Sequence, residues 1–521
     1  MTVIEPTTEN AAQKPPVRTR ALIIGTGFSG LGMGIALQRQ GVEFLILEKA
    51  DDIGGTWRDN TYPGCACDIP SHLYSFSFEP KADWKNLFSY QEEIQDYLQG
   101  VTDKYGLRRF IVFNSLVNRA HWDDDEFRWH VFTADGREYV AQFLISCAGA
   151  LHLPSIPDFD GRDQFAGPAF HSAEWDHGVD LTGKRVAVIG TGASAIQIVP
   201  EIVGTVAELL LYQRTPPWVV PRTNDELPAG LRRALENIPG LRLAFRGGIY
   251  GLQEALAVSM TKRPWLLKAG ELLGKWNIRR SVKDRELRRK LTPRYQIGCK
   301  RILNSSTYYD AVADPKTKLI TEGIARITRD GIVTVDGVEH KVDVIVYATG
   351  FHVSDSFRYV EIKGLNGEDL GDRWNREGPI AHRGTSVADV PNVFFLLGPN
   401  TGLGHNSMVY MIESQIHYVV EAVKAVDKAG AEALAPTRAA QDAFNDGLQE
   451  RLGHSVWNTG GCASWYLDEH GNNRVLWGGY TWEYRLATRK LEPAEYRFFG
   501  PNGRDTQAHD VVLPEVVAPQ G

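Results

Sequence analysis

The chain has 521 residues, of which 43% are hydrophobic and 23% charged, and its 57 basic and 64 acidic residues give a net charge of −7. These proportions are ordinary for a globular enzyme, and the length suggests about two to four domains. The negative balance argues against a chain that binds nucleic acid through its overall charge, so we expect no nucleic-acid partner. No stretch approaches the roughly 20 apolar residues of a membrane span, so none is expected.

Cysteine usage and the first segment bear on the compartment. Five cysteines occur, at Cys65, Cys67, Cys147, Cys299 and Cys462. They form no CxxC pair and no metal-type spacing, which predicts free thiols, no metal site and a reducing compartment. Segment 1–18 is polar, contains proline and lacks the apolar core of a signal peptide, so we expect a flexible tail. Together these features predict a cytoplasmic location.

Residues 20–48 have the order of a dinucleotide-binding unit. A short apolar strand (21–24) leads into a glycine-rich turn, a helix-like run follows, and a second strand (44–47) ends the unit. A glycine turn in this strand–turn–helix context is typical of the Rossmann fingerprint. The N-terminus of the helix offers free N–H groups and the positive end of a dipole to phosphates.

The three glycines of this turn and the acid after the second strand each have a separate role in the Rossmann fingerprint. Gly25 makes the tight turn, Gly27 lets a pyrophosphate approach the backbone, and Gly30 lets the helix pack closely on the strand. Glu48 ends the second strand, where a carboxylate accepts hydrogen bonds from a ribose diol and repels a 2′-phosphate. The first unit is therefore predicted to hold FAD or NAD.

Residues 185–214 repeat this design with a different charge at its end. Their turn runs through 190–195, with alanine in place of the third glycine, and the second strand (208–213) ends at Arg214. A guanidinium there can bind a 2′-phosphate through two hydrogen bonds, which predicts NADP in the second unit. The alternative is that Arg214 is a solvated charge at a strand end. Opposite charges in the two units favour a flavoprotein that draws electrons from NADPH.

Later segments complete the two units. A buried strand within 142–159 ends in small residues and prolines, and 342–351 shows a similar exit. A strand, a glycine-rich turn and a helix follow in 391–415, where the chain is expected to return to the first unit with the helix N-terminus facing a flavin. The fold class is therefore predicted to be α/β, with two Rossmann-like dinucleotide-binding domains, for FAD and NADP, and a helical insertion.

The predicted domain limits follow this order. They are a tail (1–18), the first part of the FAD-binding domain (19–155), the NADP-binding domain (156–375) with the helical insertion (225–295), and the second part of the FAD-binding domain with a C-terminal segment (376–521). Between Arg279 and Arg301 the chain has ten Lys or Arg residues against two acids. This run is expected to be a solvated helix face, and the alternatives are a contact to NADP phosphates or to an acidic membrane surface.

The sequence shows no second redox centre to which a reduced flavin could pass its electrons. Flavin disulfide reductases carry a CxxxxC pair beyond the FAD fingerprint, whereas Cys65 and Cys67 have one residue between them, a poor geometry for a disulfide. No other second redox centre is evident in the sequence. A reduced flavin is therefore expected to pass electrons to O2 or directly to a substrate.

A motif between the two units identifies a family resemblance. Phe165, Gly167, His171, Trp175 and Asp176 fit the pattern FxGxxxHxxxW followed by Pro or Asp. This pattern resembles the signature of type I Baeyer–Villiger monooxygenases, which are related to flavin-containing monooxygenases. Further segments resemble the family in the same order: 54–57 (GGTW), 62–68, 212–222, 298–301 (GCKR) and 348–351 (ATGF). The resemblance covers roughly residues 18 to 500.

The resemblance implies an activity and three catalytic residues. In the family NADPH reduces FAD, O2 forms a C4a-peroxyflavin, and a ketone becomes an ester or lactone. Arg301 would stabilise the negative charges of this sequence, and Asp68 would pair with Arg301 and orient it. The alternative for Arg301 is an NADP phosphate contact. His171 would belong to a connector that rearranges during turnover, or it is a satisfied structural histidine.

The resemblance and the two fingerprints together imply the cofactor contacts. For FAD they are Gly25, Gly27, Ser29, Gly30, Glu48, Gly55, Thr56, Trp57, Ala66, Cys67, Asp68, Tyr74, Val117 and Met408. For NADP they are Gly190, Thr191, Gly192, Ser194, Gln197, Arg214, Thr215 and Lys300. The expected partners are a small carbonyl substrate and O2.

Two other functions stay open at this point. The run Gly404-His405-Asn406 is closer to flavin-containing monooxygenases, which leaves room for S- or N-oxygenation. Trp175 and Asp176 argue against it. A flavin-binding redox protein without turnover is the other alternative, and the complete NADP motif argues against that. The sequence says nothing of the oligomeric state.

Overall fold

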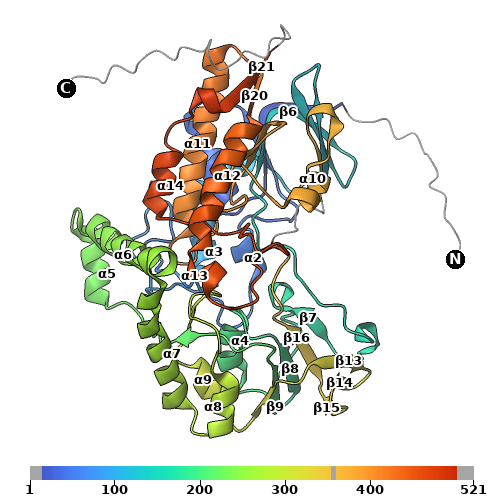
Figure 1. The fold of residues 1–521 in the computed structure, drawn as a ribbon, viewed down its shortest axis with the longest axis vertical. Coiled ribbons are helices and arrows are strands. Elements are labelled where there is room, and N and C mark those ends of the chain that lie inside the picture. The colour runs from blue at the N-terminus through green and yellow to red at the C-terminus, as the bar shows by residue number, and fades with distance from the viewer. Residues whose placement is uncertain (1–14, 354–359, 501–521) are drawn as a thin grey trace, which may run out of the picture.

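The computed structural model describes residues 15–353 and 360–500, and two sheets dominate it (Figure 1). The first sheet, with the C-terminal helices, occupies the upper part of the view, and the second sheet lies below. The predicted α/β class with two Rossmann-like units and a helical insertion is confirmed.

The first sheet has a parallel core in the order β19-β6-β1-β2-β3, extended beyond β6 by the antiparallel strands β5 and β4 and then by β17. Its strands are β1 (Val17–Ile24), β2 (Phe44–Leu47), β3 (Ile111–Val112), β4 (Val117–Asp123), β5 (Arg128–Thr133), β6 (Glu138–Ser146), β17 (Glu361–Lys363), β18 (Ser386–Val387) and β19 (Val390–Phe395). The strand predicted at 44–47 has these bounds in the structure. Ala21, Leu22 and Ile23 of β1 are fully buried, as a central parallel strand requires.

The second sheet is parallel throughout, in the order β12-β9-β8-β16-β7. Its strands are β7 (Ala169–His171), β8 (Arg185–Ile189), β9 (Glu208–Tyr212), β12 (Thr317–Ile320) and β16 (Val344–Tyr347). Small sheets accompany it: β10 (Val219–Val220) with β11 (Leu303–Asn304), the antiparallel β13 (Ile324–Thr328), β14 (Gly331–Thr334) and β15 (Glu339–Lys341), and β20 (Ala433–Pro436) with β21 (Tyr496–Phe499). β8 and β9 hold the same places here as β1 and β2 hold in the first sheet.

Helices cover both sheets. They are α1 (Phe28–Arg39), α2 (Thr56–Asp59), α3 (Gln91–Lys104), α4 (Ala195–Ile202), α5 (Ala229–Asn237), α6 (Leu241–Ala257), α7 (Lys268–Ser281), α8 (Arg285–Leu291), α9 (Tyr308–Val312), α10 (Leu370–Glu377), α11 (Met408–Ala429), α12 (Arg438–Gly453), α13 (Val456–Thr459) and α14 (Thr481–Ala487). α1 packs on α11 so closely that a Cβ at Gly32 would lie 2.8 Å from Ile416 Cδ1. α5 to α8 form the predicted insertion, and α5 and α6 project to one side in Figure 1.

Two expected boundaries differ from the structure. β1 begins at Val17, inside the segment 1–18 predicted as a tail, while residues 1–14 lie outside the described residues. β17 (Glu361–Lys363) falls in the segment predicted for the second unit, yet it pairs with β4 of the first sheet. Both differences arise because a strand's partner lies far away in the sequence, where local patterns carry no information.

The prediction of free thiols is wrong for two cysteines. Cys299 and Cys462 form a disulfide across 163 residues, with Cα atoms 6.2 Å apart. Cys65, Cys67 and Cys147 are free and buried. The pairing could not be seen in the sequence because the two cysteines meet only when the C-terminal segment folds back on the loop after α8. Among the described residues, no helix has the length and the apolar character needed to cross a membrane.

Candidate active site

The first glycine turn is shaped by close backbone approach. Gly25 has a φ of +99°, a region that favours glycine, and a Cβ there would lie 2.7 Å from the carbonyl oxygen of Cys147. A Cβ at Gly30 would lie 1.9 Å from the carbonyl oxygen of Gly25. The chain can therefore pass from β1 into α1 only without side chains at these two positions.

Gly27 faces Gly55 across this turn. A Cβ on Gly55 would lie 3.2 Å from the Cα of Gly27, and nothing lies nearer than 3.9 Å to a Cβ on Gly27. Ser29 is the buried second residue of α1, and Thr56 and Trp57 open α2 directly after Gly55. Two facing glycines at a helix N-terminus leave backbone N–H groups accessible, which fits a pyrophosphate group.

Glu48 is almost fully buried at the end of β2. Its Oε2 accepts hydrogen bonds from the backbone N–H of Thr26 at 3.0 Å and from the Thr26 hydroxyl at 2.6 Å. Its Oε1 lies 3.0 Å from Arg58 Nη1 and accepts from the Ala50 N–H. These contacts fix the carboxylate beside the turn.

The second turn repeats the first with more open space. Gly190 has a φ of +116°, and a Cβ there would lie 2.3 Å from the carbonyl oxygen of Ala348, whereas a Cβ on Gly192 would meet nothing within 4 Å. The Thr191 hydroxyl donates to the carbonyl oxygen of Thr215 at 3.3 Å. The turn therefore lies beside the chain that leaves β9.

Two cations lie close together next to this turn. Burial and the nearby charge of Arg214 both lower the pKa of Lys300. The Lys300 ammonium lies over the Tyr295 ring, 5.5 Å from its centroid. Neighbouring Lys and Arg side chains repel each other, and a phosphate between them removes that repulsion.

Gln197 of α4 joins the two units. Its Nε2 donates to the carbonyl oxygen of Ala66 at 3.0 Å, and its Oε1 accepts from the Tyr62 hydroxyl at 2.9 Å. Ser194, at the start of α4, also acts on the Tyr62 hydroxyl. The second glycine turn is thereby held against segment 62–68, which contains Cys67 and Asp68.

Arg301, Asp68 and the turn before α11 converge. Arg301 Nε donates to Asp68 Oδ2 at 2.6 Å, and its Nη2 lies 2.5 Å from the same oxygen. Its Nη1 donates to the carbonyl oxygen of Leu403 at 3.3 Å. The exposed fractions of the two charged side chains are 37% and 32%, so one side of the pair stays open to a bound molecule.

The electrostatics keep Arg301 charged. The negative charge of Asp68 raises the pKa of Arg301, although burial works against it. Arg222 is a second cation acting on the same region: burial lowers its pKa, the charge of Asp68 raises it, and its guanidinium lies 4.0 Å from the centroid of the Phe88 ring. The site therefore combines one carboxylate with an excess of positive charge.

Several predicted FAD residues surround this group. The Trp57 indole N–H donates to the Tyr74 hydroxyl at 3.3 Å. Ser407 caps α11, accepting from the Val409 N–H, and donates to the carbonyl oxygen of Leu73 at 3.1 Å. Met408, the first residue of α11, therefore lies near segment 73–74.

The thiols here are not redox-active candidates. Burial raises the pKa of Cys65 to about 12 and raises that of Cys67 further. Both thiols stay protonated at neutral pH, and thiol–disulfide chemistry needs the thiolate. Val117 lies apart from them, as the first residue of β4.

His171 lies away from the Arg301 pair, in the second sheet. It ends β7 opposite Tyr347 of β16, its Nδ1 accepts from the Ala173 N–H at 3.1 Å, and its ring packs edge-on to Phe351. Burial lowers the pKa of His171 to about 4. Trp175 packs edge-on to Phe170 at 5.2 Å. These contacts describe a neutral histidine that anchors the connector.

Sequence reasoning missed three parts of the site. Arg222 and Tyr466 act on the Arg301–Asp68 pair, and Tyr466 comes from a C-terminal segment without a recognised motif. Buried Glu254 of α6 accepts from the Asn406 side-chain amide at 2.5 Å, and from the hydroxyl of Thr481 at 2.7 Å and its N–H at 3.1 Å. The available signal for Glu254 was weak: it is the single acid of α6, a helix that also carries Arg242, Arg246 and Gln253.

Comparisons with known proteins agree with this arrangement. A family model described as flavin-binding monooxygenase-like matches residues 18–230. The chain is 48% identical to a Baeyer–Villiger monooxygenase from Pseudomonas aeruginosa, over 92% of this chain and 91% of that protein. It is 47% identical to a Baeyer–Villiger monooxygenase from Streptomyces coelicolor, over 92% of this chain and 93% of that protein.

Solved structures show the same fold. A cyclohexanone monooxygenase from Rhodococcus sp. Phi1 bound to NADP+ superposes with a TM-score of 0.83 at 28% identity, over 93% of this chain and all of that one. An oxidised steroid monooxygenase bound to NADP gives 0.82 at 29% identity over 93% of this chain. The resemblance inferred from the motifs is confirmed. The chain belongs to the Baeyer–Villiger monooxygenases, within the flavin-binding monooxygenase-like family.

Proposed function

We propose that the chain is an NADPH- and O2-dependent flavin monooxygenase that converts small ketones to esters or lactones. The relatives named Baeyer–Villiger monooxygenase support this reaction, as do the related structures bound to NADP. Bound FAD would supply the redox centre that accepts electrons from NADPH and activates O2. The observation that carries the proposal is the Arg301–Asp68 pair, held beside the turn that precedes α11.

The residues present fit the two cofactors. The facing glycines Gly27 and Gly55 leave backbone open to a pyrophosphate, and Glu48 stands where a ribose diol would bind. Lys300 and Arg214 form a cation pair suited to a 2′-phosphate. The first turn would therefore bind FAD and the second NADP.

Arg301 would act as a fixed positive charge. Negative charge develops on oxygen as O2 is activated and again as oxygen transfers to the carbonyl carbon. A guanidinium keeps its proton through both steps. At 4 Å the attraction between unit charges is about 1 kcal/mol in water and about 4 kcal/mol at an effective dielectric of 20, so exclusion of water matters. Asp68 would set the direction of the guanidinium, since two of its nitrogens bind one carboxylate oxygen.

His171 would serve position rather than chemistry. It is buried in the edge strand β7, and a pKa of about 4 keeps it neutral. The connector that it anchors joins the segments of the two sheets. A change in the position of bound NADP would therefore act on this connector. Its removal would therefore alter cofactor binding before it alters the oxygenation step.

The partners and location follow from the same chemistry. A small carbonyl compound and O2 are the proposed substrates. A cytoplasmic location is proposed because the enzyme needs a steady supply of NADPH. The expectation of free thiols no longer supports this compartment, because Cys299 and Cys462 form a disulfide.

The test compares Arg301→Ala with Arg301→Lys in the FAD-loaded enzyme. Arg301→Ala should still oxidise NADPH but form hydrogen peroxide in place of ester, with ester formation reduced by at least ~100-fold, since one lost charge-stabilising donor costs that much in other enzymes. Arg301→Lys should recover part of the activity because it keeps the charge but loses the fork that Asp68 binds.

The readouts are NADPH consumption, hydrogen peroxide and ester, measured separately. Normal ester formation by Arg301→Ala would remove Arg301 from the reaction. A substrate panel of linear, cyclic and aryl ketones, sulfides and amines then tests the reaction class. Coupling of NADPH use to product only with sulfides or amines would contradict the Baeyer–Villiger assignment.

A further inference from the structure

The helical insertion exposes an unusual amount of apolar surface. Nine large hydrophobic side chains of this segment are exposed: Ile238, Leu243, Leu252, Leu256, Trp265, Leu266, Leu272, Leu273 and Trp276. Scattered single exposures are normal, but a concentration on one element marks an interaction surface. None of these residues belongs to the proposed active site.

Five of them form one surface around α7, called here the Trp265–Trp276 face: Trp265, Leu266, Leu272, Leu273 and Trp276. Trp265 and Leu266 lie in the 3-10 helix Pro264–Leu267, directly before α7. Leu272 and Trp276 are four residues apart and share a side of the helix. Their exposed fractions are 68% and 52%, and that of Trp265 is 61%.

The opposite side of α7 holds the helix on the protein. Gly274 packs so closely that a Cβ there would lie 2.8 Å from the Trp218 ring. Asn277 donates to the carbonyl oxygens of Val219 and Ser305. The polar contacts and the close packing of α7 face inward, and its leucines and tryptophan face outward. Ile278 is also buried on the inner side, so the outward leucines and tryptophan are apolar surface beyond what anchors the helix.

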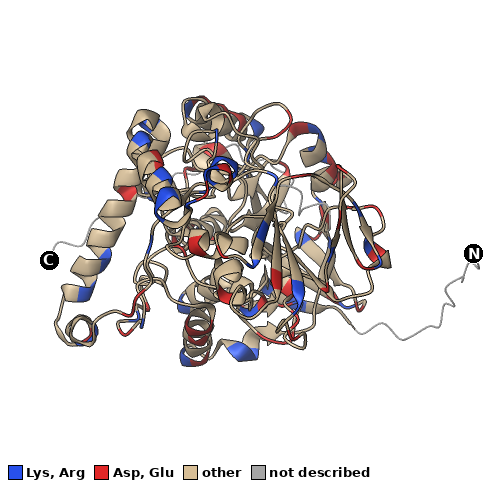
Figure 2. Cartoon of the chain, turned by 90° about the horizontal axis from the view of Figure 1, so that it is seen from below, with Lys and Arg blue, Asp and Glu red and all other residues tan. Residues whose placement is uncertain are grey.

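The same segment is strongly basic although the whole chain is acidic. Residues 258–283 contain seven Lys or Arg residues and one acid, Glu271, while the full chain has a net charge of −7. Glu271 is already paired with Lys275 at 3.8 Å. Arg263, Lys268 and Arg279 are exposed and have no carboxylate partner within the described part of the chain. In Figure 2 basic residues, with some acidic ones, recur along the helices at the left of the view, the side to which α5 and α6 project in Figure 1.

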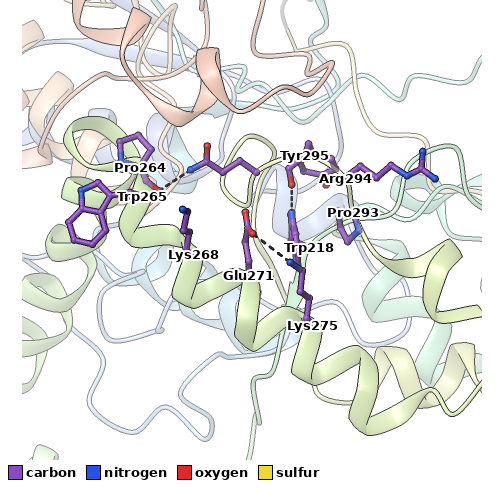
Figure 3. Close-up of a pocket in the computed structure, with 10 residues that line it drawn as sticks. Trp218, Pro264, Trp265, Lys268, Glu271, Lys275, Pro293, Arg294 and Tyr295 are labelled. Atoms are coloured by element: carbon purple, nitrogen blue, oxygen red, sulfur yellow. Dashed lines mark hydrogen bonds and ion pairs between the residues drawn. The ribbon is translucent and has the colours of Figure 1, made fainter. Parts of the chain in front are cut away.

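A cleft of about 510 Å³ opens beside the Trp265–Trp276 face. Lys268 and Lys275 line this cleft from α7, Lys275 near Trp218, and Arg294 lines it at the opposite end from Trp265 (Figure 3). Lys275 also lies over the Trp218 ring, 5.8 Å from its centroid. A cleft with cations and aromatic walls, next to exposed leucine and tryptophan, suits a phosphate-bearing headgroup whose chains lie against the apolar face.

We propose that the Trp265–Trp276 face docks the protein on the surface of an anionic phospholipid bilayer. Tryptophan and leucine would enter the boundary between headgroups and acyl chains, and the flanking Lys and Arg residues would bind anionic headgroups. A second copy of the chain fits less well, because a two-fold contact would set these cations opposite themselves. A nucleic acid would leave the leucines without a partner. The docking goes beyond the proposed reaction and does not depend on it.

The test is flotation of the FAD-loaded enzyme with vesicles. Vesicles of phosphatidylglycerol and phosphatidylcholine in equal parts should carry the protein, and vesicles of phosphatidylcholine alone should not. Binding should weaken as salt is raised. Leu272→Glu should weaken binding by at least about tenfold, since it places a charge where an apolar side chain enters the lipid. Lys268→Gln should weaken it by about fivefold.

Two matched variants serve as controls. Leu486→Glu changes a leucine of α14 that is 58% exposed, and Lys490→Gln removes an exposed lysine outside the insertion. Both should bind vesicles as the unchanged protein does, and every variant should keep its activity on a water-soluble ketone. Failure to bind the anionic vesicles, equal binding to both vesicle types, or equal loss in Leu486→Glu would overturn the proposal. A dimer seen by light scattering that Leu272→Glu dissociates would also overturn it, because a second copy would then cover the face.

Discussion

At Arg301 the guanidinium donates through Nε to one oxygen of Asp68, Nη2 lies in ion-pair contact with the same oxygen, and Nη1 donates to the carbonyl oxygen of Leu403. Both side chains are about one third exposed, and ion pairs with that access to water contribute at most ~1 kcal/mol to stability. The pair therefore matters for the orientation of the Arg301 guanidinium more than for the stability of the fold. Three nitrogens of one planar group are fixed from two segments, so the charge stands in one place when a substrate arrives.

His171 makes a residue-scale prediction about pH. Its folded pKa of about 4 lies below the ordinary histidine pKa of about 6.5, so the unfolded chain takes up the proton first as the pH falls. The free energy of unfolding should therefore drop by about 2 kcal/mol between pH 7 and pH 5 through this group alone. His171→Asn keeps an acceptor for the Ala173 N–H but does not titrate, so its stability should fall less steeply over this range.

The measurement is chemical denaturation of both proteins from pH 7 to pH 5. His470→Asn is the control, because that histidine is exposed to water in the folded chain and its replacement should leave the slope unchanged. Parallel curves for His171→Asn and the unchanged protein would contradict the neutral, buried state of His171. The motif located this histidine, but only its buried place at the sheet edge explains its charge.

At the scale of elements, the strand–turn–helix unit depends on positions that cannot accommodate a side chain. β1 must enter α1 through a turn in which the backbone of Gly25 passes under Gly30. Gly190 is restricted by a different neighbour, because a Cβ there would lie 2.3 Å from the carbonyl oxygen of Ala348, just after β16. The approach of Gly30 to Gly25 is local, because strand, turn and helix are contiguous in the sequence, whereas the contact of Gly190 with Ala348 is not. The pattern at 20–48 therefore predicted both the fold of the unit and its phosphate-binding end.

Gly30→Ala tests this element. Its Cβ would lie 1.9 Å from the Gly25 carbonyl oxygen, so the helix must move off the strand. We expect a loss of about 3 kcal/mol or more in the free energy of unfolding and a reduced FAD content. The measurements are denaturation of the purified variant and its flavin absorbance per chain.

Gly100→Ala is the matched control within α3. A Cβ there meets nothing within 4 Å, and alanine is the better helix former by up to about 1 kcal/mol. This variant should be as stable as the unchanged protein or slightly more so, with full flavin content. If the Gly30→Ala protein matched Gly100→Ala in both measurements, the close approach at the turn would not contribute to the free energy of unfolding.

Over the whole molecule, long-range contacts hold the two units and the insertion together. Gln197 joins the second glycine turn to segment 62–66, and Glu254 joins α6 to Asn406 and Thr481. Burial opposes a charge on Glu254, but hydrogen bonds from Thr481 and Asn406, with His405 Nε2 3.6 Å away, lower its pKa and keep it a carboxylate. The insertion is thus anchored at the same turn that receives Arg301.

The disulfide gives a prediction at this scale. The denatured chain without reductant should show three reactive thiols, Cys65, Cys67 and Cys147, and five after reduction. Cys462→Ser should lower the free energy of unfolding by ~2–5 kcal/mol, because the bridge closes a loop of 163 residues in the unfolded chain. Thiol titration and denaturation check both. Five thiols before reduction would show that Cys299 and Cys462 are not joined.

The sequence by itself determined the two dinucleotide units, the opposite charges of Glu48 and Arg214 at their ends, the helical nature of the insertion and the family. Each depends on turn geometry, periodicity or motifs within a short run of residues. Only the tertiary structure decided that β17 joins the first sheet, that Cys299 meets Cys462, and that Arg301 meets Asp68 across 233 residues. Such contacts depend on the path of the whole chain. Closure of long loops brings these residues together, and the local sequence around one residue does not indicate which distant residue it will contact.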